Sequence, residues 1–171
     1  ADRIEVLYMA GRPDDAENEI ESALTDFKGQ DRIYSEIASV LFGQRHDDEA
    51  FAVIKRGRSE SGNPHLFARE MARWHEAHMN WEEAIREYIL YLEERSSRLN
   101  YITGAIGDMP AESGADSIAV KLISERIEDT DPDFSIVLRR LLASLHFKAK
   151  RYGQALAQYK LLDRMGREPG R

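Results

Sequence analysis

Three stretches of the sequence share one pattern and decide the fold: GRPDDAENEIESAL (residues 11–24), QRHDDEAFAVIKRG (residues 44–57) and MNWEEAIREYILYL (residues 79–92). In each stretch a turn is followed by two or three acidic residues and then by an alanine. These alanines, Ala16, Ala50 and Ala84, lie 34 residues apart, and Ala119 and Ala155 occupy similar surroundings further along the chain. Self-similarity at a period of this length predicts a repeat architecture.

Large and small apolar residues recur with the alanines. Four residues after each alanine stands a large apolar side chain, in the order Ile20, Ile54, Tyr88, Ile123 and Tyr159. Twelve residues before four of them stands another set, Ile4, Ala38, Ala72 and Ala143, and three residues after these come Leu7, Leu41, His75 and His146. Two such positions in each period predict two helices in each period.

The remaining local signals are helical throughout the chain. Glycine and proline break it into short blocks, in which apolar residues recur at steps of three and four rather than in alternation. Acidic residues stand in the expected first turns, where they suit the positive end of the helix dipole. The sequence therefore predicts an all-α chain with ten helices, near residues 2–10, 14–27, 31–43, 47–58, 65–78, 81–95, 97–109, 114–128, 133–149 and 152–165.

The pattern resembles the tetratricopeptide repeat, a family built from 34-residue pairs of antiparallel helices, and RRLLASLHFKAKRYGQALAQYKLLDRM (residues 139–165) is the best single match. The resemblance implies a right-handed α-solenoid and one array over residues 1–171. Its repeats would cover approximately residues 1–29, 30–63, 64–96, 97–131 and 132–166. An irregular helical bundle is the alternative.

The fourth repeat departs from the family pattern. Ile106 stands where a small residue is usual, Pro110 closes the first helix, and at least one extra residue precedes Ala119. Late in the second helices, Gly57, Tyr91 and Arg126 replace the usual small residue. We therefore expect irregular packing near residues 96–131.

The two ends of the array lack polar capping helices in this sequence. The first helix is short, and only Gly166 to Arg171 follow the last one. Helix pairs in a solenoid expose an apolar face unless a neighbour covers it. We expect a fragment of a longer solenoid, or an array whose ends dock on another molecule, with exposed apolar surface at its ends and a tendency to self-associate.

Composition narrows the classes of function. The chain has 171 residues, a net charge of −7 and no cysteine. The net charge argues against a nucleic-acid partner, because phosphate binding needs clustered Lys and Arg. No apolar run has the roughly 18 residues of a membrane span, so we expect no direct membrane insertion. The compartment, cytoplasmic or periplasmic, stays open.

Catalytic and cofactor motifs are not evident. His75 and His78, with His65 and Glu76 nearby, could face one metal ion, but His75 takes a buried repeat position and a third ligand at fixed spacing is missing. The carboxylate pairs stand at helix starts, and no phosphate-binding loop is present. The sequence predicts neither an enzyme nor a cofactor.

Two features point to a binding surface. The aromatic residues Trp74, Trp81, Tyr88, Tyr91 and Tyr101 predict packing between the third and fourth repeats, with a peptide pocket as the alternative. The second helices at residues 14–28 and 81–95 are strongly acidic, whereas the first helices, which line the concave surface in the family, are close to neutral. Beside their buried stripes stand Arg32, Ser35, Ser39, Arg69, Arg73, Asn100, Thr103, Arg140, Ser144 and Phe147.

These residues predict a groove that receives an acidic segment of a partner protein or peptide, because guanidinium groups grip carboxylates with two parallel hydrogen bonds. Ordinary solvated arginines are the alternative. The favoured function is a non-enzymatic scaffold for protein–protein interaction. The alternative is a regulatory or cell-envelope assembly or export domain of a larger protein, whose catalytic or membrane module lies outside this sequence.

Overall fold

The computed structural model describes residues 1–167, and within them the regular structure consists of ten α-helices and two short 3-10 helices. The helices are α1 (Asp2–Met9), α2 (Pro13–Asp26), α3 (Asp31–Gly43), α4 (Asp47–Ser61), α5 (Ala68–Ala77), α6 (Trp81–Glu94), η1 (Ser96–Arg98), α7 (Leu99–Gly107), η2 (Ala111–Ser113), α8 (Ala115–Glu128), α9 (Pro132–Lys148) and α10 (Tyr152–Arg167). The predicted all-α class is confirmed. The predicted helix over 65–78 is shorter, because residues 64–67 form turns.

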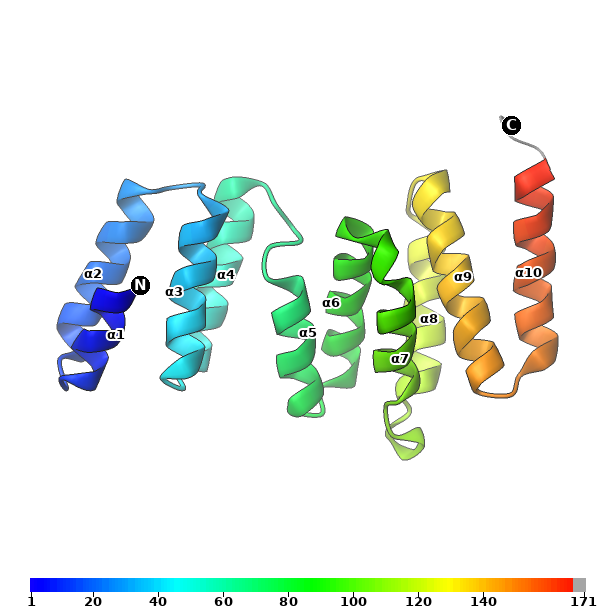
Figure 1. The fold of residues 1–171 in the computed structure, drawn as a ribbon, viewed down its shortest axis with the longest axis horizontal. Helices are drawn as coiled ribbons and strands as arrows, with labels where there is room; N and C mark the ends of the chain where they lie inside the picture. The colour runs from blue at the N-terminus through cyan, green and yellow to red at the C-terminus, as the bar shows by residue number, and fades with distance from the viewer. Residues whose placement is uncertain (168–171) are drawn as a thin grey trace. The chain divides into compact units, whose positions relative to one another are not determined.

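The chain divides into two compact units, Ala1–Phe67 and the part that begins at Ala68. In the first unit α1 packs on α2 and α3 packs on α4, and in the second α5 packs on α6 and α9 packs on α10. Within each of these pairs the two helices run antiparallel, as the ribbon shows (Figure 1). Consecutive paired helices are the arrangement of a helical repeat.

The five alanines that define the repeat lie in α2, α4, α6, α8 and α10, the second helices of their pairs. All five are 3 % exposed or less. This confirms that they occupy contacts between helices, where only a small side chain lets two backbones approach.

The turn before each alanine has one conformation throughout the chain. The residue five positions earlier has a positive φ in every case: Gly11 (69°), Arg45 (63°), Met79 (59°), Gly114 (72°) and Lys150 (59°). In four of the pairs the next residue donates its backbone N–H to a carbonyl five residues back, namely Leu7, Leu41, His75 and His146, at 2.8–3.0 Å. This bond, with a left-handed residue inside it, is the Schellman ending of a helix. The period is therefore present in the backbone as well as in the side chains.

The core of the first unit is organised around Tyr34 of α3, which is fully buried. Its hydroxyl donates a hydrogen bond to Glu60 of α4 and accepts one from the backbone N–H of Gly29 at 3.1 Å. Its ring occupies the space beside Gly57, where an added Cβ would lie 2.7 Å from Tyr34 Cγ. A glycine in the middle of α4 is therefore required by packing.

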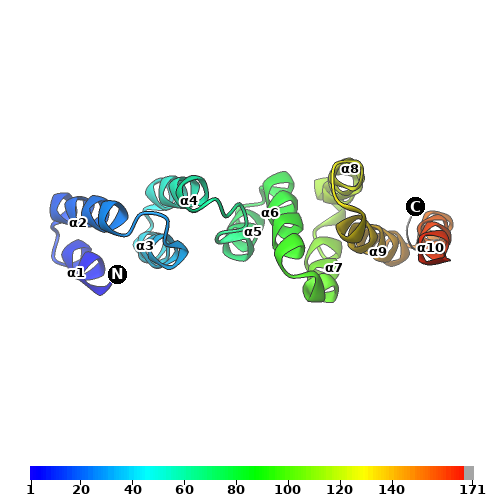
Figure 2. The ribbon, with the colours of Figure 1, turned by 90° about the horizontal axis from the view of Figure 1, so that it is seen from above.

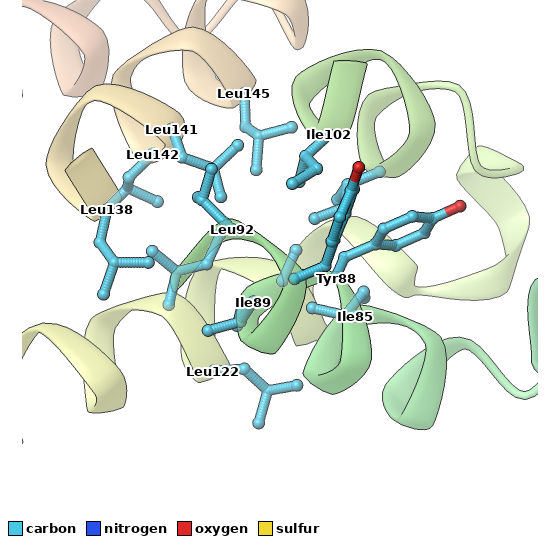
Figure 3. Close-up of a cluster of buried hydrophobic side chains, with 14 of the residues drawn as sticks. Ile85, Tyr88, Ile89, Leu92, Ile102, Leu122, Leu138, Leu141, Leu142 and Leu145 are labelled. Atoms are coloured by element: carbon cyan, nitrogen blue, oxygen red, sulfur yellow. The ribbon is translucent and has the colours of Figure 1, made fainter. Parts of the chain in front are cut away.

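The core of the second unit is one cluster of buried side chains from α5 to α9. Ile85, Ile89 and Leu92 of α6 meet Ile102 of α7 and the leucines of α9 in its centre (Figure 3).

The pair α7–α8 departs from the others, as the sequence predicts for residues 96–131. Two 3-10 helices flank α7, and α8 packs more extensively against α6 and α9 than against α7. Figure 2 shows α8 beside α6. Ile106 of α7 is buried in the core cluster of this unit.

Candidate functional site: the groove between α5 and α7

A groove of about 900 Å³ lies between α5 and α7 in the second unit, and side chains of α6 also line it. Its lining, called here the α5–α7 groove, consists of Arg73, Glu76, Ala77, Trp81, Tyr88, Asn100, Tyr101, Gly104, Ala105, Asp108, Met109 and Pro110. Two first helices and the following loop thus supply the walls, and the second helix α6 supplies aromatic side chains below them. Two features distinguish the groove: its packed aromatic side chains and one arginine that forms no ion pair with a described residue.

Tyr88 and Tyr101 line the groove, and Tyr91, which is outside the lining, packs on Tyr101. Tyr88 and Tyr91 of α6 are buried, and the ring of Tyr101 of α7 meets both edge-to-face, with centroids 6.3 Å and 6.5 Å away. Tyr101 itself is 45 % exposed. Edge-to-face contacts of this kind are a favoured arrangement of aromatic pairs. Tyr101 therefore packs on two buried tyrosines and leaves part of its side chain exposed in the groove.

A part-buried hydrogen bond joins Tyr88 of α6 to α5. The hydroxyl of Tyr88 donates to Oε2 of Glu76 at 2.6 Å. Burial, and then this bond to a carboxylate, raise the pKa of Tyr88 well above its ordinary value. Tyr88 thus stays protonated, and one oxygen of the Glu76 carboxylate is engaged inside the protein.

Two arginines one turn apart on α5 supply the positive charge. Arg69 pairs with its neighbour Glu70, and this hydrogen bond raises the pKa of the guanidinium. Arg73 is exposed, lines the groove, and forms no ion pair or hydrogen bond with any residue among 1–167. Arg73 is consequently the cation in the groove that is free to bind an anionic group.

Asp108, at the end of the groove lining, forms an ion pair with α9. Nζ of Lys148 in α9 lies 2.7 Å from Oδ1 of Asp108, which follows α7. The lysine stem passes over Gly107, where an added Cβ would lie 2.6 Å from Lys148 Cδ. Glycine at this position lets α9 reach across the end of α7.

The other predicted residues of this unit differ in their surroundings. Asn100 lines the groove, and Thr103, one turn along α7, is half-buried, with a hydroxyl oxygen that makes no hydrogen bond to a described residue. Arg140 is exposed on α9, and Ser144 is half-buried. Phe147 is exposed, and its ring meets Tyr152 of α10 at 5.6 Å.

The predicted residues of the first unit lie on α3. Arg32 is exposed and forms an ion pair with Glu36 at 3.3 Å. The hydroxyl of Ser39 donates to the backbone carbonyl of Ser35 at 2.8 Å. The structure thus brings Arg73 and Asn100 into one groove, with Arg69 one turn away, and places the serines in local hydrogen bonding.

The histidines considered as metal ligands have other surroundings. His78 stacks on Trp74 with centroids 3.8 Å apart, and its Nδ1 lies 2.8 Å from the Trp74 carbonyl. Burial lowers the pKa of His75, which favours the neutral ring. Residues 1–167 contain no group of three His, Cys, Asp or Glu side chains placed to hold a metal ion. None of the helices described combines the length and apolar composition needed to cross a membrane.

A second hollow, of about 370 Å³, lies between α6 and α8 and is bordered by Arg86, Leu122 and Arg126. Here Arg126 is engaged, because its guanidinium donates to Glu93 at 2.6 Å and to the carbonyl of Asp129 at 2.7 Å. Arg86 is likewise paired with Glu82, so this hollow offers less free positive charge than the α5–α7 groove.

Sequence reasoning did not find the Tyr88–Glu76 bond or the walls made by Met109 and Pro110. The bond joins residues 12 apart on different helices, so no local motif reports it. The loop walls follow from the irregular end of α7. The aromatic spacing did predict the packing of Tyr88, Tyr91 and Tyr101.

In comparisons with known proteins, no family model, no curated protein and no solved structure matches this chain.

Proposed function

We propose that this chain is a tetratricopeptide-like array that binds an extended segment of a partner protein in the α5–α7 groove and catalyses no reaction. The observation that carries the proposal is the combination of a packed, half-exposed Tyr101 ring with the unpaired Arg73 guanidinium in one groove. An aromatic or apolar side chain of the segment would pack on Tyr101, and a carboxylate would bind Arg73 through two parallel hydrogen bonds.

The energetics require both contacts. Exposed ion pairs contribute roughly 0–1 kcal/mol each, so arginines alone would bind weakly. Binding energy in protein interfaces concentrates in a few aromatic and arginine anchors. Tyr101 supplies such an anchor, and Arg73, with Arg69 one turn away, supplies the preference for acidic segments.

The repeat supports the same proposal. The alanine period and the paired helices are features that the tetratricopeptide resemblance implies, and the left-handed turn recurs before the same alanines. In that family the first helices line the binding surface, and here α5 and α7 supply most of the groove.

The test compares two double variants that change net charge equally. Arg69→Ala with Arg73→Ala removes the free groove cation Arg73 and its neighbour Arg69, one turn away on α5. Arg86→Ala with Arg95→Ala removes two exposed cations from α6 and the residue after it. Each protein is immobilised and exposed to an extract of the cells that produce it, and captured proteins are quantified by mass spectrometry.

We expect a partner that is captured by the unchanged protein and by the Arg86/Arg95 variant but lost with the Arg69/Arg73 variant. Circular dichroism should show the same helix content in all three. A partner retained equally by both variants would place the interaction surface elsewhere and overturn the proposal.

A further inference from the structure

The last helix exposes a position that the other helices bury. Tyr159 of α10 follows Ala155 by four residues and is 45 % exposed, whereas Ile20, Ile54, Tyr88 and Ile123, at the same repeat position, are at most 7 % exposed. Tyr152 and Leu156 lie on the same side of α10 as Tyr159, at helical steps of four and three, and both are more than half exposed. These three side chains form an apolar stripe, called here the α10 face.

The chain itself shows what covers such a stripe. Tyr88 of α6 is covered by α7, whose Tyr101 meets its ring, and Ile123 of α8 lies in one cluster with the leucines of α9. In both cases the cover is the first helix that follows along the chain. The partner that fits the α10 face is therefore the first helix of another helix pair.

The first helix of the chain has an uncovered stripe of its own. Asp2, Glu5, Val6 and Met9 lie on one side of α1 at steps of three, one and three, and all are exposed, Val6 at 61 % and Met9 at 75 %. This stripe, called here the α1 face, has two apolar side chains beside two carboxylates.

The charges of the first and last helix pairs indicate which of the exposed faces can pack together. The α1–α2 pair (residues 2–26) carries eight acidic and two basic residues, whereas the α9–α10 pair (residues 132–167) carries two acidic and eight basic residues. Asp163, the one acidic residue of α10, stands four residues after Tyr159 in line with the apolar stripe, and Lys160 and Arg164 lie beside the stripe. Basic residues still outnumber acidic ones on this side of α10, so two α10 faces would repel each other, and an α1 face and an α10 face would attract.

We propose that copies of this chain associate head to tail, with the α10 face of one copy packed on the α1 face of the next. Such an interface uses two different surfaces, so each added copy presents a new free face and assembly continues beyond the dimer unless it closes into a ring. The proposal goes beyond binding in the α5–α7 groove and does not depend on it.

The test uses variants that block one face each. Leu156→Gln with Tyr159→Gln blocks the α10 face, and Val6→Gln with Met9→Gln blocks the α1 face. All four side chains are exposed, so folding is checked by circular dichroism, and mass is measured by analytical ultracentrifugation over a range of protein concentrations.

We expect the unchanged protein to reach masses above the dimer as concentration rises, and to dissociate with added salt. Each blocked variant alone should remain monomeric, because every contact needs one face of each kind. An equimolar mixture of the two should form dimers and nothing larger, since only one intact α10 face can meet one intact α1 face.

Three results would overturn the proposal: a monomeric unchanged protein at every concentration, a dimer of the α1-blocked variant alone, or association that persists in the α10-blocked variant. A further variant leaves the apolar stripe intact. Lys160→Glu with Arg164→Glu should weaken association by about tenfold at low salt, as two reversed surface charges imply, and unchanged association would contradict the charge argument.

Discussion

Tyr88 of α6 donates a hydrogen bond to Glu76 of α5 across 2.6 Å, and this bond ties together the two helices that support the groove. Burial raises the pKa of Tyr88 in the folded protein above that of the unfolded chain. The folded state therefore favours the protonated phenol, and its contribution to stability is complete below about pH 10. As pH rises above that value, we expect the free energy of unfolding to fall.

Urea denaturation at pH 8 to 11 measures this loss, with Tyr88→Phe as the comparison. The substitution should cost about 1–2 kcal/mol near neutral pH, because Glu76 loses its internal donor. It should also reduce the loss of stability at alkaline pH. Part of the loss of stability at alkaline pH remains in the Tyr88→Phe variant, because burial and the hydrogen bond to Glu60 also raise the pKa of Tyr34. An identical pH dependence in both proteins would contradict the role of Tyr88.

Met79 and Gly11 occupy the same left-handed position in two repeats, so substitutions to and from glycine there should change stability in opposite directions. Met79 adopts φ 59° with an exposed side chain, and Gly11 adopts φ 69° with no atom near an added Cβ. A residue with a Cβ is disfavoured in this region by about 1 kcal/mol. Met79→Gly should therefore raise the midpoint of thermal unfolding, and Gly11→Ala should lower it. Shifts of the same sign in both would show that the two turns are not equivalent.

Two glycines in the middle of helices should respond oppositely to alanine. At Gly57 a Cβ would lie 2.7 Å from both Tyr34 and Leu66, whereas at Gly104 nothing lies within 4 Å. Alanine gains about 0.5–1 kcal/mol over glycine in a helix, so Gly104→Ala should stabilise the second unit. Gly57→Ala should destabilise the first, because the contact exceeds that gain. Denaturant titrations followed by circular dichroism would check both signs.

The buried alanines should not accept larger side chains. Ala84 and Ala50 are fully buried, and leucine at either position should cost roughly 1–3 kcal/mol through overpacking. Ala52, exposed on the same helix as Ala50, is the matched control, and Ala52→Leu should change stability little. Equal effects of Ala50→Leu and Ala52→Leu would contradict the close helix contact.

Much of the fold follows from sequence because its determinants are local and periodic. Ala16, Ala50 and Ala84 recur at one spacing, and each helix carries its own apolar stripe, so the ten helices could be placed in advance. The irregular region around α7 was also predictable, since Ile106, Pro110 and an extra residue before Ala119 depart from the period. The burial of Gly57 against Tyr34 depends on how two helices meet, and no local pattern contains that information.

The site was predictable only in part. Arg73 and Asn100 stand beside the buried stripes of their helices, which is a local property, and both line the groove. The engagement of Arg32 by Glu36 and of Ser39 by Ser35 depends on rotamers. The exposure of Tyr159 depends on what covers α10. Residues 168–171, which the sequence analysis includes in the uncapped end, lie outside the described residues.

The most direct test of the account is a comparison of two tyrosines that are equally exposed. Tyr101 in the groove and Tyr159 on α10 are both 45 % exposed. A peptide selected from a random library for binding to the unchanged protein is titrated by fluorescence anisotropy against Tyr101→Ala and Tyr159→Ala. We predict an acidic peptide whose affinity falls about tenfold or more with Tyr101→Ala, as loss of an aromatic anchor implies, and stays unchanged with Tyr159→Ala. Binding that Tyr101→Ala leaves intact would contradict the claim that the α5–α7 groove is the binding site.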